Sequence, residues 1–184
     1  MATKHPLDDS GKRRQRGFSL LETAIVVAIL AIVGASAAPS FSAMVEARRL
    51  DAAATKLAAD IQLARNEAIA RNQTLRLSVR AGEDATCWIV HSGAAADCRC
   101  TADAVVCAAD ALAIKSVVLP GSERVAVSGN VASIAFEPLH GTSTPTGTLR
   151  LTDARGRAVH HVVNVVGRVR SCSPGGGVPG YPTC

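Results

Sequence analysis

Aromatic residues are scarce in this chain of 184 residues, which contains one tryptophan, one tyrosine and three phenylalanines. Beyond residue 45 the aromatic side chains are Trp88, Phe136 and Tyr181. Trp88 and Phe136 fall in predicted strands, where large aromatic side chains usually belong to the core. A surface that binds nucleic-acid bases by stacking is therefore not expected.

Catalytic signatures are also missing. The sequence has no Gly-x-Ser-x-Gly elbow, no His-Glu-x-x-His, no phosphate-cradling glycine loop and no credible pair of carboxylates. The neighbours His160 and His161 lie in a predicted strand, so they should point to opposite faces and cannot easily bind one ion. We expect no enzyme, no cofactor and no metal site. A membrane-tethered enzyme is an alternative, but it would need a reactive residue that the sequence does not display.

Charge is absent from Thr23 to Val45. A basic leader precedes this run, with Lys12, Arg13, Arg14 and Arg16. Such a leader should stay cytoplasmic while the apolar run enters the bilayer. The stretch from Phe18 to Ala38 is long enough, at roughly 1.5 Å per residue, to cross the hydrocarbon core of about 30 Å. The run is longer than the apolar region of a signal peptide, which predicts a retained single-pass helix with the rest of the chain in the periplasm.

The sequence Gly17-Phe18-Ser19-Leu20-Leu21-Glu22 joins the leader to this run and resembles the processing site of type IV prepilins. The resemblance implies that a prepilin peptidase cuts after Gly17 and that Phe18 becomes the N-methylated first residue. It also implies that Glu22 serves filament assembly. A carboxylate in the bilayer needs a cation, which the new amine of Phe18, from its own or a neighbouring subunit, would supply. The expected location is the inner membrane and then a pilus at the cell surface, among other major or minor pilins.

An amphipathic helix is predicted after the apolar run. Its apolar residues recur at steps of three and four, and they are Leu50, Ala54, Leu57, Ile61, Ala64 and Ala68. We expect this helix to end near Asn72. The predicted segments are a leader at 1–17, a membrane and assembly helix at 18–45, a globular domain at 46–172 and a glycine- and proline-rich tail at 173–184.

Alternating residues after the helix predict β-structure. A hairpin is expected over Leu75–Val90, with a turn at Gly82-Glu83-Asp84. Further strands are expected at Ile114–Leu119, Val125–Ser128, Val131–Phe136, Thr148–Thr152 and Ala158–Val166, and a cross-linked loop at 92–111. The predicted fold is therefore α+β and pilin-like, a long N-terminal helix packed on an antiparallel sheet or small sandwich.

The six cysteines fit disulfides in an oxidising periplasm. They are Cys87, Cys98, Cys100, Cys107, Cys172 and Cys184. Fifteen pairings are possible, although the spacing suggests that Cys172 and Cys184 close the tail together. A zinc site at the first four is an alternative, but the Cys-x-Cys of Cys98 and Cys100 is not the usual ligand spacing.

Residues 120–184 form the basic part of the chain beyond the leader, with six arginines, no lysine and three acids. Within it, Gly167-Arg168-Val169-Arg170 would place Arg168 and Arg170 on one side of an extended strand, where two guanidinium forks match adjacent phosphates. This motif, with the segment Phe136–Gly141, resembles the minor pilins of the FimT or GspH-like group. In the DNA-uptake members of that group the motif contacts DNA.

The resemblance implies that Arg168 and Arg170 bind the DNA phosphate backbone for uptake in natural transformation, with little sequence preference. Gly167, Arg155 and Arg157 are further candidates, although the sequence leaves open whether the last two lie near Arg168. The main alternative is a pseudopilin or priming subunit of a type IV pilus or type II secretion filament that binds no DNA. Alternating arginines also occur simply as the solvent face of a strand.

Overall fold

The computed structural model describes residues 18–82, 84–101, 104–108 and 110–184. The chain divides into two compact units, the first ending at Phe41 and the second spanning Ser42–Cys184. The helix α1 (Leu20–Ala70) contributes to both units. Gly17 and the rest of the predicted leader lie outside the described residues.

In the first unit, α1 is apolar and exposed. Its most apolar 18-residue window has a mean hydropathy of 2.3, which is long and apolar enough to cross a membrane. Ser19 caps the helix, because its Oγ accepts a hydrogen bond from the backbone N–H of Glu22 at 3.1 Å. The start of the predicted membrane helix therefore follows from local chemistry, a capping serine followed by an apolar run.

In the second unit, α1 buries the predicted apolar stripe completely. Leu50, Ala54, Leu57, Ile61, Ala64 and Ala68 are all 0% exposed. The pair Glu67 and Arg71, four residues apart, meets at 2.6 Å near the end of the helix. The helix ends at Ala70, two residues before Asn72, which adopts a positive φ of 49°.

The strands form two main antiparallel sheets. The five-stranded sheet has the order β5 (Ala113–Pro120), β2 (Ala85–His91), β1 (Leu75–Ala81), β7 (Ser133–Phe136) and β8 (Ser143–Thr144). The four-stranded sheet has the order β11 (Val169–Cys172), β10 (Ala158–Val163), β9 (Gly147–Asp153) and β6 (Val125–Gly129). There are also two short 3-10 helices, η1 (Gly121–Glu123) and η2 (Pro174–Gly176).

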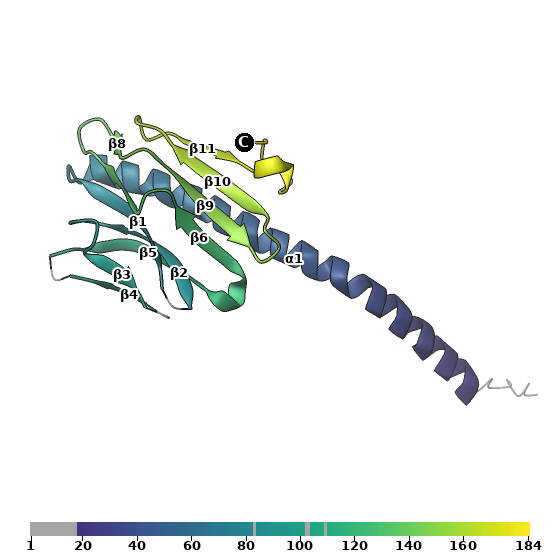
Figure 1. The fold of residues 1–184 in the computed structure, drawn as a ribbon. Helices are drawn as coiled ribbons and strands as arrows, with labels where there is room; N and C mark the ends of the chain where they lie inside the picture. The colour runs from purple at the N-terminus through teal and green to yellow at the C-terminus, as the bar shows by residue number, and fades with distance from the viewer. Residues whose placement is uncertain (1–17, 83, 102–103, 109) are drawn as a thin grey trace, which may run out of the picture. The chain divides into compact units, whose positions relative to one another are not determined.

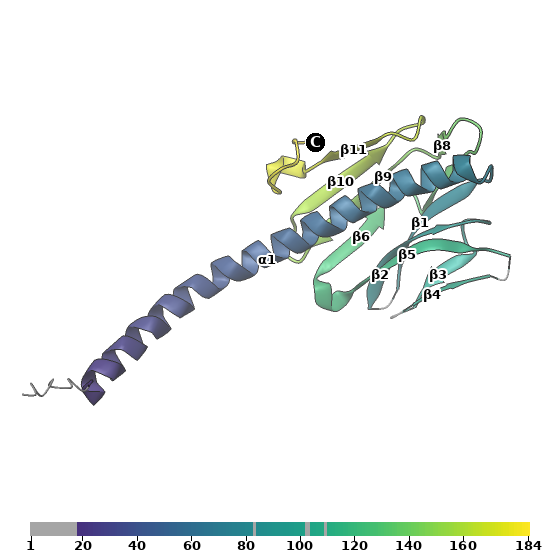
Figure 2. The same ribbon diagram turned by 180° about the vertical axis from the view of Figure 1, so that it is seen from behind.

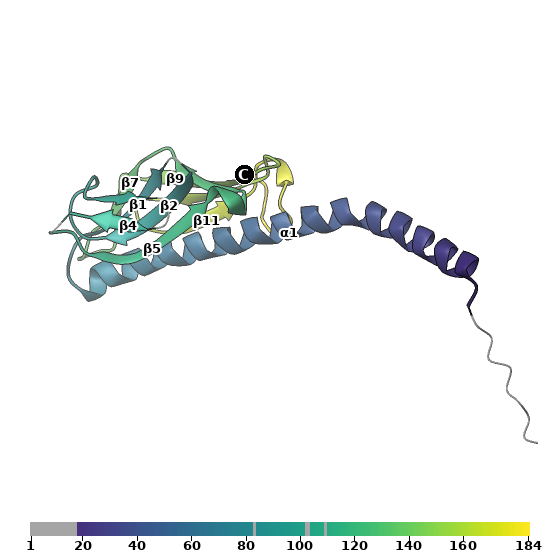
Figure 3. The same ribbon diagram turned by 90° about the horizontal axis from the view of Figure 1, so that it is seen from below.

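The C-terminal half of α1 covers both sheets. Figure 2 shows this part of the helix crossing in front of the strands, and Figure 3 shows the strands on one side of it. The core between helix and sheets contains Trp88 and Phe136, both fully buried, as their positions in predicted strands indicated. The α+β, pilin-like prediction is confirmed: the helix packs on two sheets, which lie in front of it in Figure 1.

Two predictions of β-structure need correction. The strand expected over Ala158–Val166 ends at Val163, because Asn164 begins a turn in which its backbone N–H bonds to the carbonyl oxygen of Arg168 at 3.1 Å. Residues 92–111 are not simply a loop. They contain a hairpin of β3 (Cys98–Cys100) and β4 (Val105–Cys107), whose two strands pair antiparallel.

The cysteines pair as three disulfides, Cys87–Cys100, Cys98–Cys107 and Cys172–Cys184. The first four thus pair among themselves, and the last two close the tail, as expected. Cys98 and Cys107 are register partners across the β3–β4 hairpin, which this bond locks. Of the described residues, no group of three or more His, Cys, Asp or Glu side chains could hold a metal ion.

Candidate nucleic-acid interface

The Gly-Arg-x-Arg motif lies at the turn between β10 and β11. Arg168 precedes β11, and its backbone N–H donates to Oδ1 of Asn164 at 2.9 Å. Arg170 lies within β11, opposite Val162 of β10. Val169 between them packs against the core, while both arginine side chains are exposed. Because side chains alternate along an extended chain, Arg168 and Arg170 flank Val169 on the side away from the core.

Gly167 has a structural reason to be glycine. Its φ is +72°, a conformation that side-chain-bearing residues rarely adopt. A Cβ there would also lie 2.6 Å from the carbonyl oxygen of Gly141 and 2.7 Å from Cδ of Arg65. Gly167 is buried against these neighbours, so it shapes the turn that presents Arg168.

The outer face of the four-stranded sheet adds Arg150, which the sequence analysis missed, and His160, which it considered only as a metal ligand. Val159, His161 and Val163 of β10 are buried, so His160 and Val162 point to the opposite face. His160 is the register partner of Arg150 on β9, and Arg150 is exposed. Arg150, His160 and Arg170 therefore share this face. Sequence alternation could have flagged Arg150, but only the register places it across β10 from Arg170.

The sign of charge on this face is uniform. The one acid in the four strands, all fully described, is Asp153, which is buried and pairs with Arg157 at 2.6 Å. Among the described residues no ion pair involves Arg150, Arg168 or Arg170. Burial, followed by the nearby charge of Arg150, lowers the pKa of His160. At neutral pH the positive charge of the face thus comes from its arginines.

His161 does not contribute to this surface. It is buried beneath the sheet, and its Nδ1 lies 2.8 Å from the Oγ of Ser171. Burial lowers the pKa of His161 to about 4, so the ring is neutral at pH 7. The two neighbouring histidines face opposite ways, which confirms the geometric part of the prediction.

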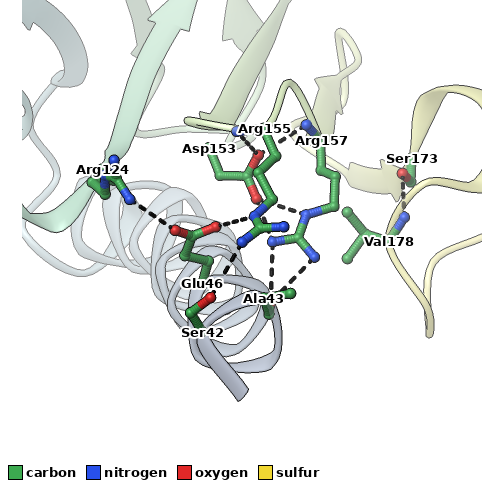
Figure 4. A network of polar contacts seen from close by, with 9 residues as sticks. All are labelled: Ser42, Ala43, Glu46, Arg124, Asp153, Arg155, Arg157, Ser173 and Val178. Atoms are coloured by element: carbon green, nitrogen blue, oxygen red, sulfur yellow. Dashed lines mark hydrogen bonds and ion pairs between the residues drawn. The ribbon is translucent and has the colours of Figure 1, made fainter. Parts of the chain in front are cut away.

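The structure does not bring Arg155 and Arg157 to Arg168. They lie in the turn before β10, whereas Arg168 follows its other end, and six residues of strand span about 20 Å. Figure 4 shows both side chains directed at α1. Arg155 pairs with Glu46, and Nε of Arg157 donates to Asp153 at 2.7 Å. The position of Arg155 and Arg157 in the turn between two strands did not predict that they pair with Glu46 and Asp153.

Glu46 is the centre of this second cluster. Its carboxylate binds Arg155 through Oε2 and Arg124 through Oε1, the latter at 3.0 Å (Figure 4). Arg124 itself has a positive φ of 59°, and its backbone N–H donates to the carbonyl oxygen of Gly121, closing η1. The hydrogen bond from Arg155 is the main cause that lowers the pKa of Glu46. The cluster is therefore a clamp between α1 and two loops of the sheets.

The residues predicted for processing and assembly belong to the first unit or precede it. Gly17 is outside the described residues, and Phe18 is exposed at the start of the described chain. Glu22 lies in the first turn of α1, where an acid is favourable beside the free N–H groups. The roles of Gly17, Phe18 and Glu22 stay predictions.

Two family models match this chain. The one described as type II transport protein GspH matches residues 53–167, and the one described as prokaryotic N-terminal methylation motif matches residues 12–38. The first match spans more than half of the chain and ends at Gly167, so Arg168 and Arg170 lie beyond it. No curated protein sequence matches the chain.

Among solved structures, the type IV minor pilin FimU of Pseudomonas aeruginosa (strain PAO1) is similar. Its crystal structure in space group P65 has a TM-score of 0.51 and 15% identity, and the match covers 68% of this chain and 98% of the FimU chain in the crystal. Its structure in space group P21 has a TM-score of 0.48 and 16% identity, covering 70% and 94%. The first of these likenesses shows a shared fold.

Proposed function

Because the chain belongs to the family of the type II transport protein GspH and carries a prepilin-type N-terminus, we propose that it is a minor pilin that captures extracellular DNA. The captured DNA is taken up in natural transformation. The binding site is the basic surface of Arg168, Arg170 and Arg150. Electrostatic attraction holds the phosphate backbone, and retraction of the filament then draws the DNA toward the cell.

The observation that carries this proposal is the pair of exposed arginines on either side of a core-packed Val169. The core contact of Val169 and the bonds between the Arg168 backbone and Asn164 fix the backbone from which the two arginine side chains project. Neither arginine has an ion-pair partner in the described part of the chain, so both are free to bind phosphate in bidentate fashion. The four strands of the sheet that carries this surface contain no phenylalanine, tyrosine or tryptophan, which favours binding with little sequence preference.

The proposed function requires that the chain is first processed and anchored in the inner membrane. The match to the methylation motif supports processing by a prepilin peptidase and assembly with other pilins. In our proposal the helix first anchors the chain in the inner membrane, with the Ser42–Cys184 unit in the periplasm. Assembly into a pilus then carries the basic surface to the cell exterior, where DNA is available.

The test is DNA binding by the full chain in a non-ionic detergent, measured with a fluorescent duplex over a salt series. We expect micromolar affinity that falls with salt. Replacing Arg168→Ala and Arg170→Ala should abolish most of the binding and reduce the steepness of the log–log salt dependence by about 2, because two phosphate contacts are lost. The matched control is Arg48→Ala with Arg99→Ala, which removes the same charge from exposed positions elsewhere.

A second candidate function is a priming subunit or pseudopilin that binds only neighbouring pilins. The description of the matching family, a type II transport protein, favours it. The two functions predict different results in cells. DNA capture requires that the Arg168→Ala, Arg170→Ala variant keep its pili and lose transformation. Absence of DNA binding by the unaltered chain at low salt would instead leave the priming function as the better account.

A further inference from the structure

A groove runs beside the arginine motif, between α1 and the β10–β11 turn. It has a volume of about 460 Å³ and is lined by Gln62, Arg65, Val166, Gly167 and Arg168. We refer to these five residues as the Arg65 groove. Two of them are arginines, one from the helix and one from the turn, and none is acidic. The groove is therefore suited to an anion.

Arg65 is held in place by two glycine-containing loops. Its Nε donates to the carbonyl oxygen of Gly141 at 3.0 Å. Gly141 and Gly167 both have positive φ, and a Cβ at either would come within 2.9 Å of Nε of Arg65. Both loops thus approach the arginine as closely as only glycine allows. Such contacts fix the direction of a side chain that would otherwise be flexible.

The bond to Gly141 occupies one of the five N–H groups of Arg65. In the described part of the chain, no hydrogen bond or ion pair to its terminal Nη1 and Nη2 atoms is found, and the residue is partly exposed. These atoms form the planar fork that binds phosphate in bidentate fashion. The one acid of the adjoining loop, Glu137, accepts a hydrogen bond from the hydroxyl of Thr142 at 2.9 Å and does not line the groove.

We propose that the Arg65 groove binds a phosphodiester group of the captured DNA, with Arg65 and Arg168 contacting it from opposite walls. This rests on the proposed DNA-binding function and assigns it a further residue, on α1 and outside the Gly-Arg-x-Arg motif. Arg168 belongs to both the groove and the exposed motif, so the phosphate backbone of one DNA strand can run from Arg170 past Arg168 to Arg65. Gly167 then serves to bring the turn against Arg65.

The sharpest variant is Gln62→Glu, because it places a negative charge in the groove with almost no change of shape. The control is Gln73→Glu, the same replacement at an exposed position beyond the end of α1 and outside the groove. For the full chain in detergent and a fluorescent duplex, we expect Gln62→Glu to weaken binding roughly threefold to tenfold beyond the control. Arg65→Gln should reduce the steepness of the salt dependence by about 1, the share of one phosphate contact.

The outcomes separate this inference from the proposal on which it rests. If the unaltered chain binds no DNA at low salt, the proposed function itself fails. If the unaltered chain binds and Arg168→Ala with Arg170→Ala abolishes binding, while Gln62→Glu equals Gln73→Glu, the function stands and the groove site is overturned. Unchanged unfolding of Gln62→Glu, followed by the fluorescence of Trp88, excludes a folding defect as the cause of weaker binding.

Discussion

Glu46 is a carboxylate on α1 that two arginines from different loops hold against the sheets. It is only 8% exposed although it carries a charge, and burial of a charge requires such partners. Arg124 comes from the end of η1 and Arg155 from the β9–β10 turn. The side chain of Glu46 therefore joins the helix to a loop at the end of each sheet. Within the Ser42–Cys184 unit, here called the globular unit, this residue ties α1 to both sheets.

Replacing Glu46→Gln should lower the stability of the globular unit at neutral pH, because Arg124 and Arg155 lose their anionic partner. The pKa of Glu46 is lowered in the folded state, so its stabilisation is complete above the ordinary glutamate pKa and is lost as pH falls through the folded-state pKa. The difference in stability between wild type and variant should therefore shrink as the pH drops below the ordinary glutamate range. Urea unfolding followed by Trp88 fluorescence, at neutral and acidic pH, measures it.

Trp88 suits this measurement because it is the one tryptophan of the chain and is fully buried. The matched control is Glu67→Gln, which changes an acid on the same helix whose ion pair with Arg71 is exposed and worth a few tenths of a kcal/mol. Equal stability losses in the two variants would show that the Glu46 cluster is no stronger than a surface pair. A pH-independent difference would contradict the cause given for the lowered pKa.

At the scale of an element, the tail from Ser173 to Cys184 is a structured part of the unit. Val178 is buried in the core, and its N–H donates to the Oγ of Ser173 at 3.1 Å. The hydroxyl of Tyr181 donates to Asp51 of α1 at 2.9 Å, and burial raises the pKa of Tyr181. The tail thus ties the end of β11 to the helix.

The disulfide Cys172–Cys184 should stabilise this arrangement by restricting the unfolded chain. Replacing Cys172→Ser and Cys184→Ser together should cost about 3 kcal/mol of unfolding free energy, the usual size for a loop of this length. Urea unfolding of the oxidised proteins measures the loss. Val178→Ala, which keeps the disulfide and removes only packing, separates the two contributions. An unchanged free energy of unfolding in the double cysteine variant would disprove the stabilising role of the disulfide.

At the scale of the whole molecule, the proposed tasks occupy different parts of the chain. Processing and assembly involve Gly17, Phe18 and Glu22, whereas DNA capture involves residues of the Ser42–Cys184 unit. The two tasks can therefore be damaged separately. A variant that affects assembly should lose transformation because the protein is absent from the pilus. A variant that affects the basic surface should lose transformation because the protein no longer binds DNA.

Glu22→Gln should reduce incorporation into pili severalfold, because a neutral amide cannot pair with the amine of Phe18. The amount in the membrane should stay the same, and the purified chain should bind DNA as before. Immunoblots of sheared pili and of membranes measure the first two quantities. Glu67→Gln, a neutralised acid in the other unit, is the control and should assemble normally. Full incorporation of Glu22→Gln would overturn the proposed role of this carboxylate.

Much of this fold could be predicted because its signals are local. The stripe from Leu50 to Ala68 follows the helical period, and the alternation in Leu75–Val90 follows the strand period, so each predicts its buried face without knowledge of partners. The pairing of Cys172 with Cys184 was suggested by proximity along the chain. The prediction that the strand extends to Val166 was wrong. It relied on the preference of valine for strands, whereas the turn that ends β10 depends on the backbone hydrogen bond between Asn164 and Arg168.

The sequence by itself determined the apolar helix, its prepilin-like start, the α+β architecture and the exposed arginines of the Gly-Arg-x-Arg motif, since periodicity and motif spacing act over a few residues. Only the tertiary structure decided which distant groups meet. It placed Arg65 beside Gly141, 76 residues away, and Arg155 beside Glu46, 109 residues away. Contacts at such separations depend on sheet register and on how the helix packs across both sheets, which no local pattern encodes.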